Sequence, residues 1–128
     1  MKLKLLCLAI AFLGFNACTS QPAISNDAPS GTWSGNYEVV PGRSEAISVE
    51  LRWEDPEHLR GVVRSGFRTL PITKASFNRD TGAITIEFDA EGNGRTVHYL
   101  VDGKISDNTM TGTWSHDNQR GAFRVTKE

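Results

Sequence analysis

Cysteine is scarce in this chain of 128 residues, which contains only Cys7 and Cys18. Both lie near the N-terminus, so no disulfide framework can hold the rest of the chain together. An excess of positive charge is also lacking, because 14 Lys and Arg residues face 15 Asp and Glu residues, for a formal charge of -1. This balance gives no reason to expect a surface that binds nucleic acid, which we exclude as a partner.

Long apolar runs are lacking too, apart from one at the N-terminus. Lys2 and Lys4 precede an apolar run from Leu5 to Phe15, which is the arrangement of a secretory signal peptide. The run is shorter than the roughly 20 apolar residues that a membrane-spanning helix needs. We therefore expect a signal peptide over residues 1–17 and no transmembrane span.

The signal peptide ends in Phe15-Asn16-Ala17-Cys18, which resembles the lipobox of bacterial lipoproteins. The resemblance implies that Cys18 is acylated on sulfur, becomes the new N-terminus and anchors the protein to a membrane. Because Thr19 stands where these proteins carry an Asp for inner-membrane retention, it further implies the outer membrane, with the protein facing the periplasm of the bacterial cell envelope. The alternative is an ordinary secretory signal cut after Ala17, which would leave Cys18 free.

Polar residues dominate the segment that follows, residues 18–30, which has little to bury and is expected to be a flexible tether.

From Gly31 onward, apolar side chains recur with a period of two, as in Ile47, Val49, Leu51 and Trp53, and no long stretch keeps a helical period. This pattern predicts a single domain over residues 31–128. Eight or nine strands are expected, at 32–40, 45–53, 59–65, 68–72, 74–78, 83–89, 95–105, 109–115 and 121–127.

Turn residues separate these strands at short spacing, for example Pro41-Gly42 and Asp80-Thr81-Gly82. Short connections favour antiparallel neighbours, and an open meander of so many strands would leave two bare edges. The expected fold class is therefore all-β, a small antiparallel up-and-down barrel of eight or nine strands.

One four-residue sequence occurs twice, as Gly31-Thr32-Trp33-Ser34 and as Gly112-Thr113-Trp114-Ser115. The first and last strands of a closed meander are neighbours, so we expect the two copies to lie side by side, with chance recurrence as the alternative. The Gly31-Thr32-Trp33 start resembles the Gly-x-Trp motif of lipocalin-like (calycin-type) small β-barrels. The resemblance implies that Trp33 packs over the closed end of the barrel against an Arg of the final strand, for which Arg124 is the matching position.

Aromatic side chains fall mostly on the expected inward faces of the strands. Three glycines beside them, Gly35, Gly61 and Gly112, either leave local space or mark bends that help the barrel to close, and the sequence leaves both interpretations open. The candidate ligand-binding or core residues are Trp33, Tyr37, Trp53, Phe88, Tyr99, Trp114 and Phe123.

Catalytic and metal-binding patterns are missing. Ser34 lacks the Gly-x-Ser-x-Gly spacing of a nucleophile elbow, and we expect the separated His58, His98 and His116 to be solvated. Residues 89–94 have the oxygen ligands of a calcium loop, but Leu100 stands where the bidentate Glu belongs. We therefore expect that the protein is not an enzyme and that it binds no metal and no cofactor. Arg52, Arg60, Arg64 and Arg68, in the middle strands, are expected to share an exposed face of mixed charge with acidic residues.

The function expected from these observations is that of a membrane-anchored envelope lipoprotein whose lipocalin-like barrel binds a small apolar ligand non-covalently. The alternative is a protein–protein interaction or inhibitor module of the cell envelope with a filled barrel. A cavity above about 300 Å3 would favour the ligand carrier, and a filled interior would favour the interaction module.

Overall fold

The computed structural model describes residues 27–92 and 94–128. Cys18, the expected signal peptide and most of the expected tether lie outside these residues. Within the described part of the chain, no helix is long and apolar enough to cross a membrane.

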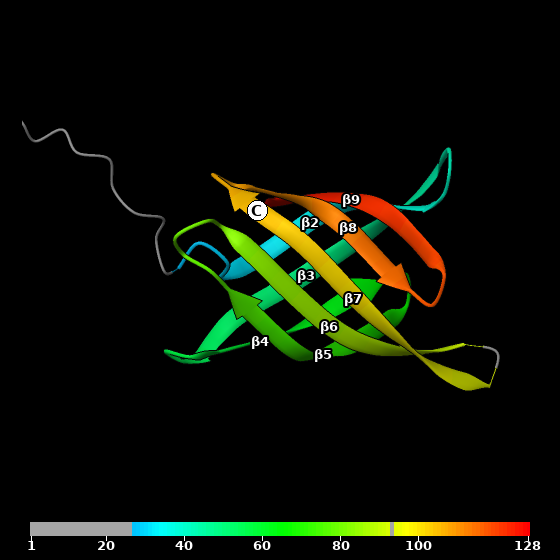
Figure 1. The fold of residues 1–128 in the computed structure, drawn as a ribbon, viewed down its shortest axis with the longest axis horizontal. Helices are drawn as coiled ribbons and strands as arrows, with labels where there is room; N and C mark the ends of the chain where they lie inside the picture. Colours follow the sequence, from blue (N-terminus) through cyan, green and yellow to red (C-terminus); the bar gives the residue numbers. More distant parts are fainter. Residues whose placement is uncertain (1–26, 93) are drawn as a thin grey trace, which may run out of the picture.

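Eight antiparallel strands form one closed barrel, in which each strand pairs with its neighbours in sequence and the last pairs with the first (Figure 1). This confirms the prediction of an all-β, antiparallel up-and-down barrel. The strands are β2 (Gly31–Val40), β3 (Arg43–Asp55), β4 (His58–Ser65), β5 (Arg68–Phe77), β6 (Ala83–Gly92), β7 (Arg95–Ser106), β8 (Thr109–His116) and β9 (Gln119–Lys127).

Tight turns join the strands, and six of the seven connections leave only two residues between strand ends. Two-residue hairpins favour backbone conformations with positive φ, and five of these six connections contain one. Such conformations occur at Gly42, Gly66, Gly94, Asp107 and Asp117.

The expected strands at 68–72 and 74–78 are in fact one strand, β5. Its register with β6 shifts between Ile72 and Lys74, which marks a β-bulge. At the bulge, the Thr73 hydroxyl donates a hydrogen bond to the Glu87 carbonyl at 3.0 Å. The bulge breaks the period-two pattern without ending the strand, which is why the sequence suggested two strands.

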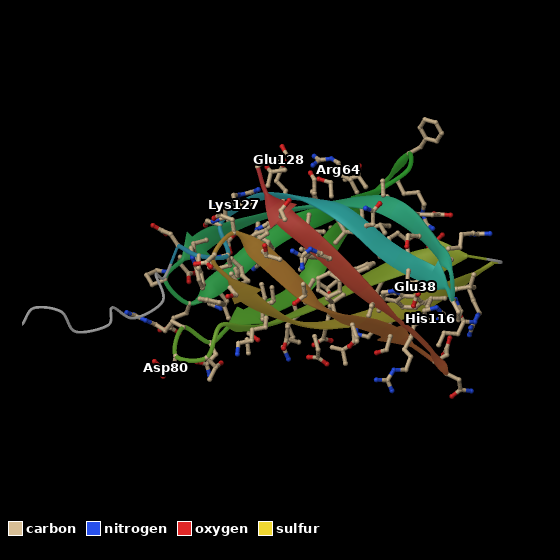
Figure 2. The ribbon with its side chains drawn as sticks, turned by 90° about the horizontal axis from the view of Figure 1, so that it is seen from above. Glu38, Arg64, Asp80, His116, Lys127 and Glu128 are labelled. Atoms are coloured by element: carbon tan, nitrogen blue, oxygen red, sulfur yellow. The ribbon has the colours of Figure 1, made fainter. Side chains whose placement is uncertain are left out.

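The two ends of the barrel differ. We call one end the mouth; it carries the turns that follow β2, β4, β6 and β8. We call the other the sealed end; it carries the remaining turns and both termini of the described chain (Figure 1). In Figure 2, Lys127 and Glu128 lie toward the sealed end, and Glu38 and His116 lie together toward the mouth.

Trp33 seals one end of the barrel. Its side chain has no exposed surface, and its Nε1 donates a hydrogen bond to the carbonyl of Pro29 at 2.9 Å. The Nζ atom of Lys127 lies 5.2 Å from the centre of the indole ring, within cation–π range. Arg124, which was expected in that place, is exposed and pairs with Asn36 on the outer face, because β9 turns its odd-numbered side chains inward.

The two Gly-Thr-Trp-Ser copies do not lie side by side, and that expectation is wrong. Strand β9 runs between β2 and β8, although β2 and β9 are neighbours as predicted. Along β9, Trp33 is opposite Lys127 near one end and Trp114 is opposite Gly121 near the other. The two tryptophans are therefore at opposite ends of the barrel.

Close backbone approach, and not empty space, explains three inward-facing glycines. A Cβ atom at Gly61 would lie 1.8 Å from the carbonyl oxygen of Glu50 on the neighbouring strand. The same atom at Gly35 or Gly112 would lie 2.0 Å from a neighbouring carbonyl oxygen. No side chain fits at such distances, so these positions are where the strands bend to close the barrel.

Candidate functional site

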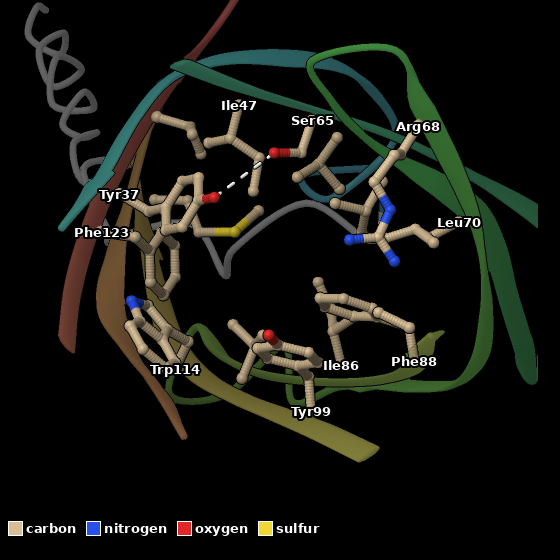
Figure 3. Close-up of a pocket in the computed structure, with 16 residues that line it drawn as sticks. Tyr37, Ile47, Ser65, Arg68, Leu70, Ile86, Phe88, Tyr99, Trp114 and Phe123 are labelled. Atoms are coloured by element: carbon tan, nitrogen blue, oxygen red, sulfur yellow. Dashed lines mark hydrogen bonds between the residues drawn. The ribbon is translucent and has the colours of Figure 1, made fainter. Parts of the chain in front are cut away.

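A cavity of about 100 Å3 lies inside the barrel and opens at the mouth (Figure 3). All eight strands contribute side chains to the lining of this cavity. Its deeper wall is formed mainly by aliphatic side chains, namely Ile47, Val49, Val63, Ile86, Val101, Met110 and Val125.

Five of the seven candidate residues named from the sequence line this cavity: Tyr37, Phe88, Tyr99, Trp114 and Phe123. The other two do not. Trp33 belongs to the seal at the opposite end, and Trp53 is partly buried and packs against the hydrophobic core.

The aromatic rings form a continuous wall on one side of the cavity. Phe88 and Tyr99 are stacked, with ring centres 5.1 Å apart and planes 4° from parallel. Trp114 continues the wall, 6.1 Å from Tyr99 and 6.4 Å edge-on from Tyr37. Aromatic rings in offset-stacked and edge-on arrangements attract one another, so this wall is formed in the absence of a ligand.

A hydrogen bond to the backbone holds Trp114 in place. Its Nε1 donates a hydrogen bond to the carbonyl of Glu38 at 2.9 Å. The last residue pair of the β2–β9 ladder is at Tyr37, so Glu38 lies just beyond the end of that ladder. The indole reaches this carbonyl across Gly121, where a Cβ atom would lie 2.7 Å from Nε1. Gly121 therefore allows Trp114 to lie against β9 and to satisfy a carbonyl that the ladder leaves unpaired.

His116 is not solvated, and the expectation for this histidine is wrong. Its side chain is 14% exposed, and its ring lies 4.6 Å from that of Tyr99 and 5.7 Å from that of Trp114. Its Nδ1 lies 3.3 Å from a carboxylate oxygen of Asp117, and this hydrogen bond is the main cause that lowers the pKa of Asp117. The sequence did hold a signal, because His116 has the same inward phase as Trp114.

The other two histidines are exposed, as expected. His98 points outward from β7, where its two ring nitrogens contact Asp89 at 2.6 Å and Glu87 at 2.9 Å. These two carboxylates, with the hydrogen bond to Asp89 contributing most, raise the pKa of His98. His58 contacts Asp55 at 2.8 Å in the turn before β4.

Arg68 is exposed, as expected, but it does not share the outer face of the sheet with the other arginines of its region. Arg60 and Arg64 do lie on the outer face, where they pair with Glu54 at 3.0 Å and Glu50 at 3.2 Å. Arg68, however, lines the cavity at the mouth. Its phase in β5 is that of the inward residues Leu70 and Ile72, which accounts for its place at the cavity.

Polar atoms gather at the rim of the cavity. The hydroxyl groups of Tyr37 and Ser65 lie 3.4 Å apart (Figure 3). Burial raises the pKa of Tyr99, and the positive charge of Arg68 opposes this shift. The cavity thus has an aliphatic floor, an aromatic wall and a polar, positively charged rim.

Ser34 lies on the outer face, where its hydroxyl hydrogen-bonds to the carboxylate of Glu128. Among residues 27–92 and 94–128, no group of three His, Cys, Asp or Glu side chains is arranged to hold a metal ion. The residues that converge on one place are those of the mouth cavity, and their chemistry suits non-covalent binding.

No protein-family model matches this chain, and a search of curated proteins finds no match to it.

Proposed function

We propose that this protein is a lipid-anchored envelope protein whose lipocalin-like barrel binds a small, largely apolar ligand non-covalently at the mouth. The observation that supports this proposal most is the asymmetry of the barrel. One end is closed by Trp33 and Pro29, and the other opens into a cavity with an aliphatic floor. A preformed apolar cavity with a few polar groups at its opening is typical of a small-molecule site.

The cavity volume limits the size of the part of the ligand that enters. Ligand pockets for drug-sized molecules have volumes of about 300–1,000 Å3, and this cavity has about 100 Å3. The cavity therefore falls short of the volume expected for a carrier that encloses its whole ligand. It suits a short apolar group that inserts at the mouth while the rest of the ligand stays at the rim.

A second candidate function is an interaction or inhibitor module that binds another envelope protein. Two observations favour it, namely the small cavity and the position of Phe67. This residue lies at the tip of the turn between β4 and β5, at the mouth, and its side chain is fully exposed. Exposed aromatic side chains are frequent anchors in protein interfaces.

A cavity-filling substitution tests the first proposal. Ala90 lines the cavity and is buried, so leucine at this position occupies space that the ligand needs. Ala122 lies on the outer face of β9 and is exposed, so Ala122→Leu is the matched control. We expect 1-hexanol to bind the unchanged protein and Ala122→Leu, and to lose binding in Ala90→Leu, as followed by the NMR signal of the Trp114 indole.

The opposite pattern would contradict ligand binding. If 1-hexanol binds Ala90→Leu as tightly as the unchanged protein, or if neither 1-hexanol nor its charged analogues hexanoate and hexylammonium bind the unchanged protein, the cavity is not a ligand site. The interaction module would then be tested through Phe67→Ser, which should abolish capture of the envelope partner while leaving the barrel folded.

The membrane anchor is a separate part of the proposal and rests on the lipobox-like Phe15-Asn16-Ala17-Cys18. One acyl chain gives marginal binding, whereas several together anchor a protein stably. We expect Cys18→Ser to release the protein from membranes or to leave an uncleaved precursor, as seen by fractionation after a high-salt wash. Membrane association of a processed Cys18→Ser protein would contradict the lipid anchor.

A further inference from the structure

Arg68 is a cation at the mouth without an anion beside it. Its Nη2 donates a hydrogen bond to the carbonyl of Glu91 at 2.9 Å. This hydrogen bond joins β5 to β6 beyond the last residue pair of their ladder. Among the residues that the structure describes, no carboxylate oxygen lies within 4.0 Å of the Arg68 nitrogens. Since a guanidinium carries five N–H donors, a single bond to a neutral carbonyl leaves donors free for a ligand.

The side chain is also directed where a ligand would meet it. Figure 3 shows the guanidinium of Arg68 turned from β5 toward the interior of the barrel, where Arg68 lines the cavity. Arg64, on the outer face of the adjacent strand, contrasts with it because its charge is paired with Glu50. The unpaired positive charge is therefore on the cavity side of the sheet.

Hydroxyl groups accompany this charge at the rim. The Tyr37 hydroxyl lies 3.4 Å from Ser65 Oγ and donates to Glu45 Oε1, also at 3.4 Å. Both distances are near the limit for a hydrogen bond, so the two hydroxyl groups can exchange these contacts for a stronger partner. Tyr99 is close enough for the charge of Arg68 to act on its phenol. A carboxylate has two oxygens that accept hydrogen bonds, and its planar geometry matches the fork of an arginine.

Below the rim, the cavity offers only apolar contacts. Its volume of about 100 Å3 is well below the roughly 300–1,000 Å3 of pockets that enclose drug-sized molecules. The cavity therefore suits a short apolar group, such as a few methylene groups of an aliphatic chain. The polar and apolar parts are thus stacked along the barrel axis, with the cation outermost.

We propose that the mouth of the barrel binds a short-chain carboxylate, whose head group is bound by Arg68 and whose aliphatic tail fills the cavity. This inference rests on the proposed function and adds the charge and the length of the ligand. A charge-assisted, bidentate arginine–carboxylate pair is among the stronger hydrogen-bonding arrangements in proteins.

Three probes with the same alkyl chain separate the head group from the tail: hexanoate, 1-hexanol and hexylammonium. Binding to the purified protein is measured by NMR titration, with the indole N–H of Trp114 as reporter. We expect hexanoate to bind about tenfold more tightly than 1-hexanol, which corresponds to about 1.4 kcal/mol, and hexylammonium to bind more weakly than both. Arg68→Met should weaken hexanoate binding about tenfold and leave 1-hexanol within about twofold, whereas Arg68→Lys should retain much of the preference.

Arg64→Met is the matched control, because it removes one positive charge from the outer face near the same turn. It should leave hexanoate binding unchanged. If Arg68→Met binds hexanoate as tightly as the unchanged protein, or if 1-hexanol binds as tightly as hexanoate, the carboxylate proposal is overturned while ligand binding itself stands. If none of the three probes binds, both the carboxylate proposal and the proposed function are wrong.

Discussion

Replacing Gly112 by alanine should destabilise the barrel strongly, although it adds a single methyl group to a strand. The new Cβ would lie 2.0 Å from the carbonyl oxygen of Asp102 and 2.5 Å from the Cα of Gly103. Ordinary contacts between such atoms are about 3.5–4 Å. Both atoms belong to the backbone of β7, so a side-chain rotation cannot relieve the overlap, and the strand must move by about 1 Å or more.

The energetic cost follows from what that movement disturbs. Overpacking a well-packed interior costs about 1–3 kcal/mol, and each ladder hydrogen bond lost adds about 1 kcal/mol. We expect Gly112→Ala to lose about 2–4 kcal/mol of unfolding free energy, of a total of about 5–15 kcal/mol for a domain of this kind. At about 4–8 °C per kcal/mol, the Tm should fall by about 8–30 °C.

Urea unfolding followed by tryptophan fluorescence measures the effect, with Gly92→Ala as the control. Gly92 is also a strand glycine, but a Cβ atom there meets no atom within 4 Å. Its replacement should change the stability by less than about 1 kcal/mol, through the entropy of the unfolded chain alone. If Gly112→Ala is as stable as Gly92→Ala, the close approach of β7 and β8 is not what closes the barrel.

Three further predictions concern the seal, the surface and the cysteines. Trp33→Ala should cost about 3–5 kcal/mol because the indole is fully buried and hydrogen-bonded to Pro29; in acrylamide quenching, a strongly quenched Trp33 in the folded protein would refute the seal. The raised pKa of His98 should make its contribution to stability fully present below pH ~6.5 and lost as the pH rises through the folded-state pKa; an NMR titration of Asp89→Asn that leaves the His98 midpoint unmoved would be inconsistent with this. Dithiothreitol should leave the melting temperature unchanged, since cysteine occurs only at Cys7 and Cys18, and a fall of many degrees would show that a disulfide supports the fold.

The period-two pattern was sufficient to predict the barrel because each strand has one face in the core and one in water. Val49 and Leu51 are buried and Arg52 is exposed, as their alternation indicated. The pattern failed at Thr73, where a bulge inserts one residue and reverses the phase within β5. A sequence read without pairing partners contains no record of such an insertion.

Only part of the candidate site was predicted, because its residues were chosen by residue type and not by their phase along the strands. Apolar residues were chosen by type, so the five aromatic residues of the cavity were found. Charged and polar residues usually lie at the surface, so Arg68 was assigned to the outer face and His116 to solvent, although Arg68, which is exposed, lines the cavity and His116 is largely buried. Their strand phase pointed inward in both cases. Arg124 was selected from a resemblance, but Lys127 has the inward phase that the contact with Trp33 requires. Phase along a strand was thus a better guide to the site than residue type.

The even number of strands has a consequence for how this barrel can change. Because the chain makes four complete up-and-down passages, its last residue returns to its first strand, where the Glu128 amide donates to the Thr32 carbonyl at 2.9 Å. Both ends of the described chain, Asp27 and Glu128, therefore lie at the sealed end, and the mouth consists only of hairpin tips. A fusion partner joined at Glu128 would therefore be attached on the side away from the opening. The hairpin tips at the mouth do not contact Trp33, so their length and sequence can change without disturbing the packing that closes the sealed end.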